Sequence, residues 1–340
     1  MALRLRMAKK IPKGEEYDVV IIGGGPAGLS AAIYTQRFLL KSLVVAKEIG
    51  GQLNLTDAVD DYPGLGKIRA SDLVNKFKQH AEMFNATIYH PEEVTEWTRL
   101  PDGRFKVKGK RGLEVIAKTI IMAVGSVRRK LGVPGEKELA GRGVSYCSVC
   151  DAPFYAGKDA VVVVGGGDAA FEGAILLSGY VKKVYLVHRR SQFRAKPFFV
   201  EVAKSKPNIE FILDSIVTEI KGKESVESVV VKNKNTGEIK ELKVDGIFIE
   251  IGFEPPKEWF QKLGLETDQA GYIKVDEWMR TSIEGVFAAG DCTSQWLGFR
   301  QVVTAAAMGA VAAYSAYNYL VEKGWYKPSE VQVKGTIFQR

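Results

Sequence analysis

The sequence has 340 residues, of which 46% are apolar and 26% charged, and its formal net charge is +8. This composition is typical of a globular protein, and at roughly 150 residues per domain the length predicts two domains. No run of about 18 apolar residues occurs, so we expect no membrane segment. No basic motif is interleaved with aromatic residues, so despite the positive charge we expect no nucleic-acid binding.

The chain begins with a basic stretch, residues 1–16, which has no apolar core. We expect a loose extension there rather than a secretory signal. A strand is then predicted over residues 17–22, a glycine-rich turn over 23–28, a helix over 29–38 and a second strand over 43–46. Strand, glycine turn, helix and strand within about 30 residues is the pattern of a dinucleotide-binding unit.

Each glycine of this turn has a physical role. Gly23 permits the tight turn from strand to helix, Gly25 lets the backbone approach a pyrophosphate, and Gly28 allows the helix to pack closely on the strand. The helix start then offers free N–H groups and a positive dipole end to phosphates. Glu48 is the acid at the spacing expected for a ribose contact, although it follows the predicted strand end, and a solvated loop carboxylate is an equal alternative.

Strands are next predicted over residues 104–107 and 114–121, followed by the only close cysteine pair, Cys147 and Cys150. This spacing lets two thiols close a small reducible disulfide, in which one thiolate is often nucleophilic. A metal would need further ligands, and the remaining histidines and Cys292 form no second paired motif. Asp151 follows directly, and both a proton-transfer role and a turn cap suit it. So few cysteines favour a cytoplasmic protein over a secreted disulfide scaffold, and isolated Cys292 is typical of a small buried residue.

The dinucleotide-binding pattern then occurs a second time. Residues 160–164 predict a strand, residues 165–170 a glycine turn, the next segment to Ser178 a helix, and residues 184–187 a strand. Gly165 lies 142 residues after Gly23, and Gly167 and Ala170 keep the same offset from Gly25 and Gly28. Two nucleotide cofactors are therefore expected.

The second unit ends in a basic loop instead of an acid. His188-Arg189-Arg190 and Arg194 occupy the position where a carboxylate would bind the 2′-hydroxyl of NAD. Arginines offer fork-shaped donors to a phosphate dianion, so the loop favours NADPH, with a plain basic surface loop as the alternative.

The remaining elements complete an α/β chain. A hairpin is predicted from strands 228–232 and 240–243 around Asn233–Gly237, and a buried strand over 246–251. The segment 285–291 predicts a strand that runs into a glycine, and an alanine-rich helix follows over about 300–322. The fold class expected is α/β, with two Rossmann-like dinucleotide-binding domains.

Seven motifs occur in order along the chain: GGGPAG at 23–28, GGQL at 50–53, CSVCD at 147–151, GGGDAA at 165–170, HRRSQFR at 188–194, FAAGD at 287–291 and RQVVTAA at 300–306. Taken together, these motifs resemble the low-molecular-weight thioredoxin reductases over about residues 17–322. The resemblance implies three-layer ββα domains: an FAD-binding domain in two pieces, 1–127 and 252–340, and an inserted NADPH-binding domain, 128–251, that carries the cysteine pair. It also implies a homodimer.

By this resemblance, hydride passes from NADPH to FAD and then to the Cys147–Cys150 disulfide, which exchanges with thioredoxin or a glutaredoxin-like protein. Cys150 faces the flavin, Cys147 attacks the partner disulfide, and Asp151 supplies a proton. The residues implied at FAD are Gly23, Gly25, Pro26, Ala27, Gly28, Glu48, Gly50, Gly51, Gln52, Leu53, Ala123, Gly125, Gly290, Asp291, Arg300, Gln301 and Val302. Those implied at NADPH are Gly165, Gly167, Asp168, Ala169, Ala170, His188, Arg189, Arg190 and Arg194, and no metal site is expected.

Two other functions stay open from the sequence. One is a flavin-dependent NAD(P)H or thiol oxidase, in which oxygen takes the electrons. The other is a redox-sensing protein that binds nucleotides and signals through its cysteines. Turnover that requires a protein disulfide would distinguish a disulfide reductase from both the oxidase and the sensor.

Overall fold

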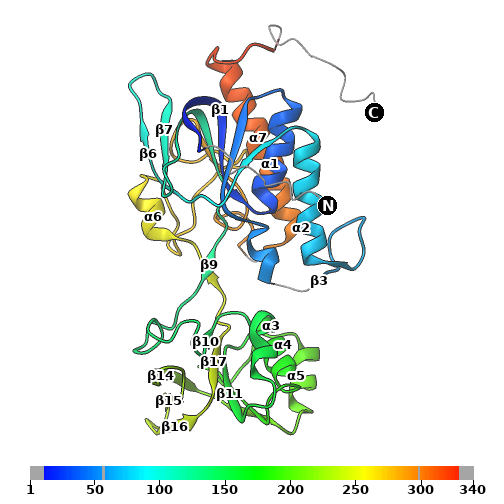
Figure 1. Cartoon of the computed structure of the whole chain (residues 1–340), viewed down its shortest axis with the longest axis vertical. Coiled ribbons are helices and arrows are strands. Elements are labelled where there is room, and N and C mark those ends of the chain that lie inside the picture. Colours follow the sequence, from blue (N-terminus) through cyan, green and yellow to red (C-terminus); the bar gives the residue numbers. More distant parts are fainter. Residues whose placement is uncertain (1–10, 56–57, 298, 329–340) are drawn as a thin grey trace, which may run out of the picture. The chain divides into compact units, whose positions relative to one another are not determined.

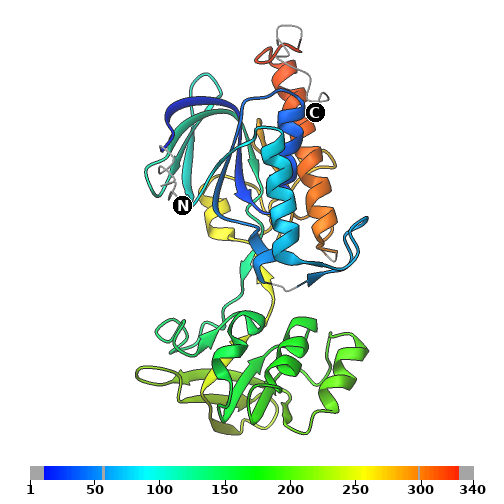
Figure 2. The same cartoon turned by 45° about the vertical axis from the view of Figure 1, so that its right-hand side comes forward.

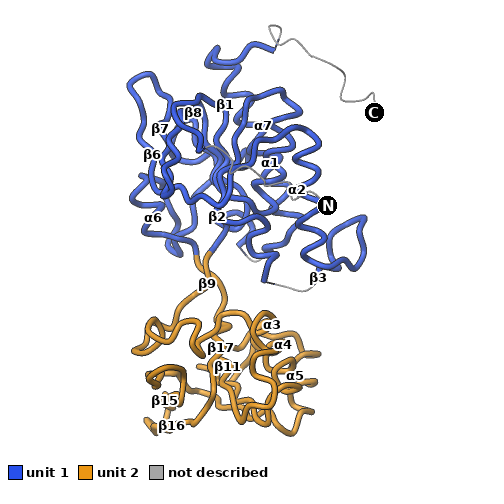
Figure 3. The backbone as a smooth tube through the Cα atoms, in the orientation of Figure 1, with its two compact units in different colours: residues 1–126, 255–340 blue, residues 127–254 orange. Residues whose placement is uncertain are grey.

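The structure is a computed structural model that describes residues 11–55, 58–297 and 299–328. The chain divides into two compact units (Figure 3). Unit 1 comprises the chain up to Ser126 and again from Pro255, and unit 2 comprises Val127–Glu254. Unit 2 is therefore an insertion within unit 1.

Unit 1 is built on a seven-stranded sheet with the order β5-β2-β1-β8-β7-β6, in which β19 also pairs with β8. The pairs that β1 forms with β2 and β8 are parallel, and those of β6 with β7 and β7 with β8 are antiparallel. The strands are β1 (Lys13–Gly24), β2 (Ser42–Ile49), β5 (Thr87–Tyr89), β6 (Val94–Arg99), β7 (Phe105–Gly109), β8 (Glu114–Met122) and β19 (Val286–Ala288).

The central strand shows why this sheet has two covered faces. Val19 and Ile21 of β1 belong to one apolar cluster with residues of α1 and α7. Val20 and Ile22 belong to another cluster, with residues of β7 and α6. Successive side chains of a strand point to opposite faces, so a continuous apolar run is buried on both.

Three helices cover the first face: α1 (Pro26–Arg37), α2 (Ala70–Met83) and α7 (Val302–Glu322) (Figures 1 and 2). Helix α7 packs very closely on α1, since a Cβ at Gly309 would lie 2.0 Å from the carbonyl oxygen of Ala27. The remaining elements of unit 1 are a 3-10 helix (Gly51–Leu55), β3 (Ala58–Val59), β4 (Ile68–Arg69) and α6 (Lys257–Lys262).

The expectation of a loose extension up to Glu16 is wrong for its last residues. Strand β1 already begins at Lys13, which pairs with Glu114, and Glu16 pairs with Ile116. Backbone pairing with β8 needs only N–H and C=O groups, so polar side chains do not prevent these residues from joining the strand. Residues 1–10 lie outside the described part of the chain.

Unit 2 has three layers. Its parallel sheet has the order β10-β17-β11-β12-β13 and lies between helices and an antiparallel sheet, β14-β15-β16. Val161 and Val163 of β11 pack with residues of α4, whereas Val162 and Val164 pack with residues of the antiparallel sheet.

The strands of unit 2 are β9 (Val127–Arg128), β10 (Val144–Ser145), β11 (Ala160–Val164), β12 (Lys183–Val187), β13 (Ile209–Ile212), β14 (Ser215–Lys221), β15 (Ser228–Asn233), β16 (Ile239–Lys243), β17 (Gly246–Ile249) and β18 (Phe253–Glu254). The helices are α3 (Ser148–Asp151), a 3-10 helix (Ala152–Tyr155), α4 (Asp168–Leu177) and α5 (Pro197–Lys204). The predicted hairpin is confirmed in β15 and β16. No helix in the described residues is long and apolar enough to cross a membrane.

Candidate redox and nucleotide sites

The first glycine turn is closely packed at Gly23 and Gly28 and open at Gly25. A Cβ at Gly23 would lie 2.1 Å from the oxygen of Ala123, and one at Gly28 would lie 2.0 Å from the oxygen of Gly23. Only glycine fits either position. At Gly25, by contrast, a Cβ would meet only the oxygen of Gly50, at 3.9 Å. Gly25 caps α1 without a side-chain hydrogen bond, so the first N–H groups of the helix are available to an anion.

Unit 1 also contains a half-buried polar cluster of Gln52, Ser126 and Asp291. Gln52 Nε2 donates to Ser126 Oγ (2.9 Å) and to Asp291 Oδ2 (3.2 Å). Burial raises the pKa of Asp291, and the positive charge of Arg300 and the bond from Gln52 oppose this rise. The site thus joins residues from three distant parts of the chain.

Arg300 supplies unused donors to this region. Its Nη1 donates to the Tyr272 hydroxyl (2.7 Å), and its guanidinium carbon lies 3.9 Å from the centre of the Tyr272 ring. Its Nε and Nη2 atoms are buried and have no hydrogen-bond partner within the described residues. Unpaired buried donors cost free energy, so a polar ligand fits here. Ser126 and Tyr272 were not predicted; Ser126 directly follows the predicted Gly125, and Tyr272 gave no sequence signal.

Several other residues predicted at FAD have their side chains committed to the protein. Leu53 is buried in an apolar cluster with Leu73 and Val74. Gln301 caps α7: its side chain accepts a hydrogen bond from the Thr304 N–H, and its own N–H donates to Thr304 Oγ1 (3.1 Å). The side chains of both residues are therefore engaged within the protein.

The other predicted positions are mostly glycines or helix-start residues. Glu48 is exposed and lies within β2, which runs on to Ile49, so the predicted strand end was too early. Pro26 and Ala27 begin α1, Val302 begins α7, and Gly50, Gly51, Gly125 and Gly290 all have positive φ angles.

The second glycine turn repeats this geometry in unit 2. A Cβ at Gly165 would lie 2.3 Å from the oxygen of Glu250, and at Gly167 a Cβ would meet nothing within 4 Å. Gly167 caps α4 without a side-chain bond. Ala170 is buried, and Ala169 is exposed on the first turn of the helix. The turn is open where a phosphate would approach.

The arginine loop is tied to this turn by hydrogen bonds. The N–H groups of Arg194 and Ala195 donate to the oxygen of Gly166 (2.8 and 3.2 Å). Asp168 accepts from the Lys196 N–H (2.7 Å) and lies 3.6 Å from its ammonium group. This pairing neutralises the one acid in the first turn of α4, which would otherwise repel a phosphate.

The loop leaves its three guanidinium groups at the surface. Arg189, Arg190 and Arg194 are exposed, and no described carboxylate forms an ion pair with them. His188 is buried, with Nε2 3.1 Å from the Gln192 oxygen, and its ring lies against Gly166. Burial lowers the pKa of His188, and the charges of the three arginines lower it further. The imidazole thus supports the loop, and the arginines remain to bind an anion.

The cysteine pair forms a disulfide within unit 2, with its Cα atoms 5.3 Å apart. Cys147 caps α3, and its Sγ accepts a hydrogen bond from the N–H of Cys150 (3.2 Å). Cys147 is buried, with 9% of its surface exposed, whereas Cys150 is exposed. Asp151 is half-buried at the end of α3, and its charge contributes, after burial, to raising the pKa of Tyr155 to about 12.

A carboxylate that the sequence did not single out lies next to this disulfide. Glu250 Oε1 accepts hydrogen bonds from the N–H (3.0 Å) and hydroxyl (2.9 Å) of Ser148. Its other oxygen, Oε2, lies 3.3 Å from Arg128 Nη1. The sequence did contain one indication of this residue: Glu250 is the charged residue within the otherwise apolar run 246–251.

Cys292 is confirmed as a buried residue, with no exposed surface. Burial raises the pKa of its thiol to about 12. Within the described residues, no group of three or more His, Cys, Asp or Glu side chains is placed to hold a metal ion.

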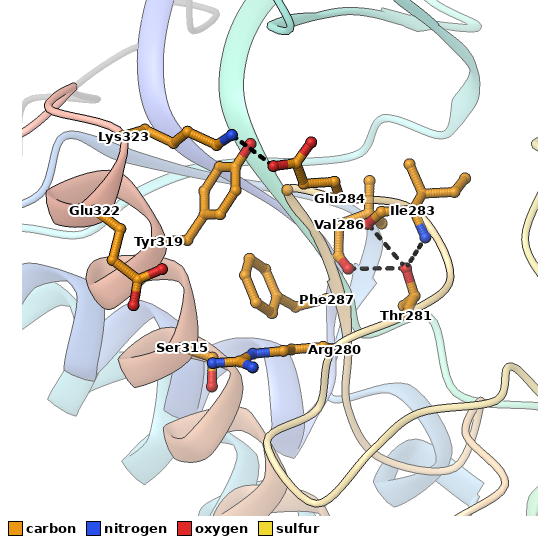
Figure 4. Close-up of a pocket in the computed structure, with 11 residues that line it drawn as sticks. Arg280, Thr281, Ile283, Glu284, Val286, Phe287, Ser315, Tyr319, Glu322 and Lys323 are labelled. Carbon is orange, nitrogen blue, oxygen red and sulfur yellow. Dashed lines mark hydrogen bonds and ion pairs between the residues drawn. The ribbon is translucent and has the colours of Figure 1, made fainter.

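A cavity of about 390 Å³ lies elsewhere in unit 1, between the β19 segment and α7 (Figure 4). Its main charged group is Glu284, which bonds to Lys323 (2.6 Å) and to Arg99 (3.2 Å). None of the predicted site residues lines it, and its Glu284 and Lys323 form an ion pair with each other. We assign it no part in the chemistry.

Comparison with known proteins shows which family the chain resembles. The family model described as pyridine nucleotide-disulphide oxidoreductase matches residues 17–309. Thioredoxin reductase of Bacillus subtilis (strain 168) is 43% identical over 309 residues, which cover 90% of this chain and 95% of the relative. Among solved structures, Lactococcus lactis thioredoxin reductase (FR conformation) is 42% identical with a TM-score of 0.82, covering 90% of this chain and 99% of the other. T. acidophilum thioredoxin reductase is 36% identical with a TM-score of 0.80 and the same coverage.

The chain therefore belongs to the pyridine nucleotide-disulphide oxidoreductase family. Within that family it is one of the low-molecular-weight thioredoxin reductases, as the resemblance of its motifs predicted. The redox-active disulfide of this enzyme class is the Cys147–Cys150 bond.

Proposed function

We propose that this oxidoreductase takes reducing equivalents from NADPH, passes them through FAD to the Cys147–Cys150 disulfide, and delivers them to thioredoxin or a related thioredoxin-fold protein. The disulfide carries the proposal, because it forms in unit 2 with one exposed sulfur, next to a second nucleotide-type glycine turn. Thioredoxin reductase is also what the similar proteins are named.

Unit 1 suits FAD. The open turn at Gly25 and the free N–H groups of α1 fit the pyrophosphate. Asp291 and the buried unpaired donors of Arg300 fit the polar atoms that follow it in a flavin dinucleotide. When bound, FAD supplies the two-electron relay between a nicotinamide and a disulfide.

Unit 2 suits NADPH. Its open turn at Gly167 faces the start of α4, and the three arginines of the loop carry unpaired charge. A dianionic 2′-phosphate matches such a cluster, whereas the neutral 2′-hydroxyl of NADH does not. We therefore propose a preference for NADPH.

The two sulfurs have different environments, which supports different roles. Cys150 is the more exposed of the two residues, and the resemblance assigns to it the role of accepting electrons from the flavin. Cys147 Sγ accepts a hydrogen bond from the Cys150 N–H at the start of α3, and this bond would stabilise a Cys147 thiolate once the disulfide opens. Cys147 is therefore the proposed nucleophile toward the partner disulfide.

The exchange balances as follows. Two electrons and two protons convert the Cys147–Cys150 disulfide into two thiols. The Cys147 thiol gives its proton to Asp151 as its sulfur attacks one sulfur of the partner disulfide, and Asp151 returns that proton to the displaced partner thiolate. Cys150 then loses its proton as it attacks Cys147 Sγ in the mixed disulfide, and the second partner sulfur leaves and takes up a proton, which restores the Cys147–Cys150 disulfide and releases the reduced partner.

A homodimer and a cytoplasmic location complete the proposal. The dimer follows from the resemblance, and light scattering coupled to size exclusion tests it. The location follows from cysteine usage, because a pair that must cycle between thiol and disulfide suits a reducing compartment.

Anaerobic titration of the FAD-loaded enzyme with NADPH tests the proposal. Bleaching of the flavin absorbance should consume two equivalents per subunit in the wild type and one in the Cys150→Ser variant. Oxidation of NADPH should then require added thioredoxin disulfide. Equal turnover with oxygen alone would favour an oxidase, and intact bleaching without turnover on any protein disulfide would favour a sensor.

A further inference from the structure

A mostly buried ion pair contacts α3, the redox helix of unit 2, which carries Cys150. The carboxylate of Glu250 binds Ser148, which stands between Cys147 and Cys150, through both its N–H and its hydroxyl. On its other side the same carboxylate binds Arg128 of β9. The pair therefore lies in direct hydrogen-bond contact with the motif that carries the disulfide.

The pair is well shielded from water. The side chains of Arg128 and Glu250 expose 18% and 11% of their surface. Arg128 also lies over the Phe253 ring, 5.4 Å from its centre. Burial raises the pKa of Glu250, while the Ser148 N–H, the charge of Arg128 and the Ser148 hydroxyl favour its ionised form. Charges in such a position act on neighbouring groups far more strongly than exposed ones.

The packing around Ser148 shows that the helix is held closely. A Cβ at Gly173 of α4 would lie 2.4 Å from Ser148 Oγ, so α4 presses directly on this residue. The other acid on that side is Glu172 of α4, which is exposed and interacts with Asp168 and Glu250. Glu250 is thus the mostly buried carboxylate that contacts the redox helix.

We propose that the Arg128–Glu250 pair is a positioning device that sets the redox potential of the Cys147–Cys150 disulfide. The inference deepens the proposed function and rests on it. Through Ser148, Glu250 holds the start of α3, which keeps the Cys150 N–H aimed at Cys147 Sγ. Its negative charge disfavours a thiolate, the positive charge of Arg128 favours one, and the potential depends on the balance of the two effects.

The chemical step affected is the reduction itself. The S–S bond breaks, two electrons enter, and the sulfurs take up two protons, or one where Cys147 remains a thiolate. A group that stabilises the thiolate stabilises the reduced form and makes the couple more oxidising. Removing either charge of the pair therefore shifts the equilibrium, and the two removals shift it in opposite directions.

The test compares Glu250→Gln, Arg128→Gln and the double variant in the FAD-loaded enzyme. Each is equilibrated anaerobically at pH 7 in dithiothreitol redox buffers, quenched with an alkylating agent, and its Cys147–Cys150 state is measured by mass spectrometry. Glu250→Gln should favour the dithiol about tenfold, which is ~30 mV toward less negative potential for a two-electron couple. Arg128→Gln should favour the disulfide by a similar factor, and the double variant should lie between them.

Glu254→Gln is the matched control. Glu254 lies on β18, and its carboxylate is 3.7 Å from Arg129 Nε, but this pair is exposed and does not contact Ser148. In this variant the redox potential of the Cys147–Cys150 disulfide should equal that of the wild type.

Shifts of the same sign in both single variants would overturn the proposal, because lost packing would then explain them; unchanged potentials would overturn it as well. If one single variant does not fold, the other still tests the proposal, because a direction of the potential shift is predicted for each. The measurement uses neither NADPH nor thioredoxin. Absence of NADPH-linked turnover in the wild type would therefore refute the proposed function and leave the potentials interpretable.

Discussion

Replacing Arg189 and Arg190 with glutamine removes two of the three unpaired guanidinium groups of the unit 2 loop. Both side chains are exposed, so a hydrogen bond from each to a phosphate dianion should contribute at the low end of the charge-assisted range, about 1.5 kcal/mol. Losing one such hydrogen bond corresponds to about a tenfold decrease in kcat/KM for NADPH. Because the two neighbours share one phosphate, their effects should add incompletely. We expect kcat/KM for NADPH to fall about 30- to 100-fold.

The assay compares NADPH with NADH in the thioredoxin-linked reaction. NADH lacks the 2′-phosphate, so its kcat/KM should change less than about threefold. Raising the salt concentration should weaken NADPH use in the wild type and have a smaller effect in the variant. Lys204→Gln, an exposed change on α5 whose ammonium pairs with Glu201, is the control and should leave both coenzymes unaffected. Equal losses with both coenzymes, or no loss with NADPH, would refute the assignment of this loop to the phosphate.

Three further predictions follow from other parts of the structure. Asp151→Asn should lower thioredoxin-dependent turnover about a hundredfold while NADPH uptake per subunit stays unchanged, and wild-type turnover would remove Asp151 as the proton donor. Gly309→Ala places a Cβ 2.0 Å from the Ala27 oxygen and should cost about 1–3 kcal/mol of unfolding free energy, measured by chemical denaturation against the exposed change Ala307→Ser. Burial raises the pKa of Cys292 to about 12, so its thiol should stay protonated and resist iodoacetamide up to pH 9 in the folded, NADPH-reduced enzyme. Labelling of Cys292 at the rate of the other two cysteines would contradict that burial.

Local features of the fold were well predicted because local sterics produce them. The glycine turns at 23–28 and 165–170 form between strand and helix as expected, since their backbone leaves no room for a side chain at Gly23 or Gly28. The hairpin of β15 and β16 also follows from a turn sequence between two alternating strands. Such patterns act over a few residues and depend little on the rest of the chain.

Predictions failed where a distant segment decides the outcome. Lys13–Glu16 are polar and looked unstructured, yet β8 pairs with them. Glu48 looked like a loop residue, yet β2 continues through it because Gly24 pairs with Ile49. The position of His188 against Gly166 likewise depends on how the whole loop folds back on the turn.

By itself, the amino-acid sequence determined the α/β class, the two glycine turns, the reactive cysteine spacing and the arginine loop, since each of these is written in neighbouring residues. Only the tertiary structure decided which distant groups meet. Gln52 reaches Asp291 across 239 residues, and Glu250 reaches Ser148 across 102. Contacts of this kind have no local periodicity, because they form only when packed layers bring the ends of separate strands together. The chemistry of the cysteine pair could thus be read from the chain, whereas the charges that surround it could not.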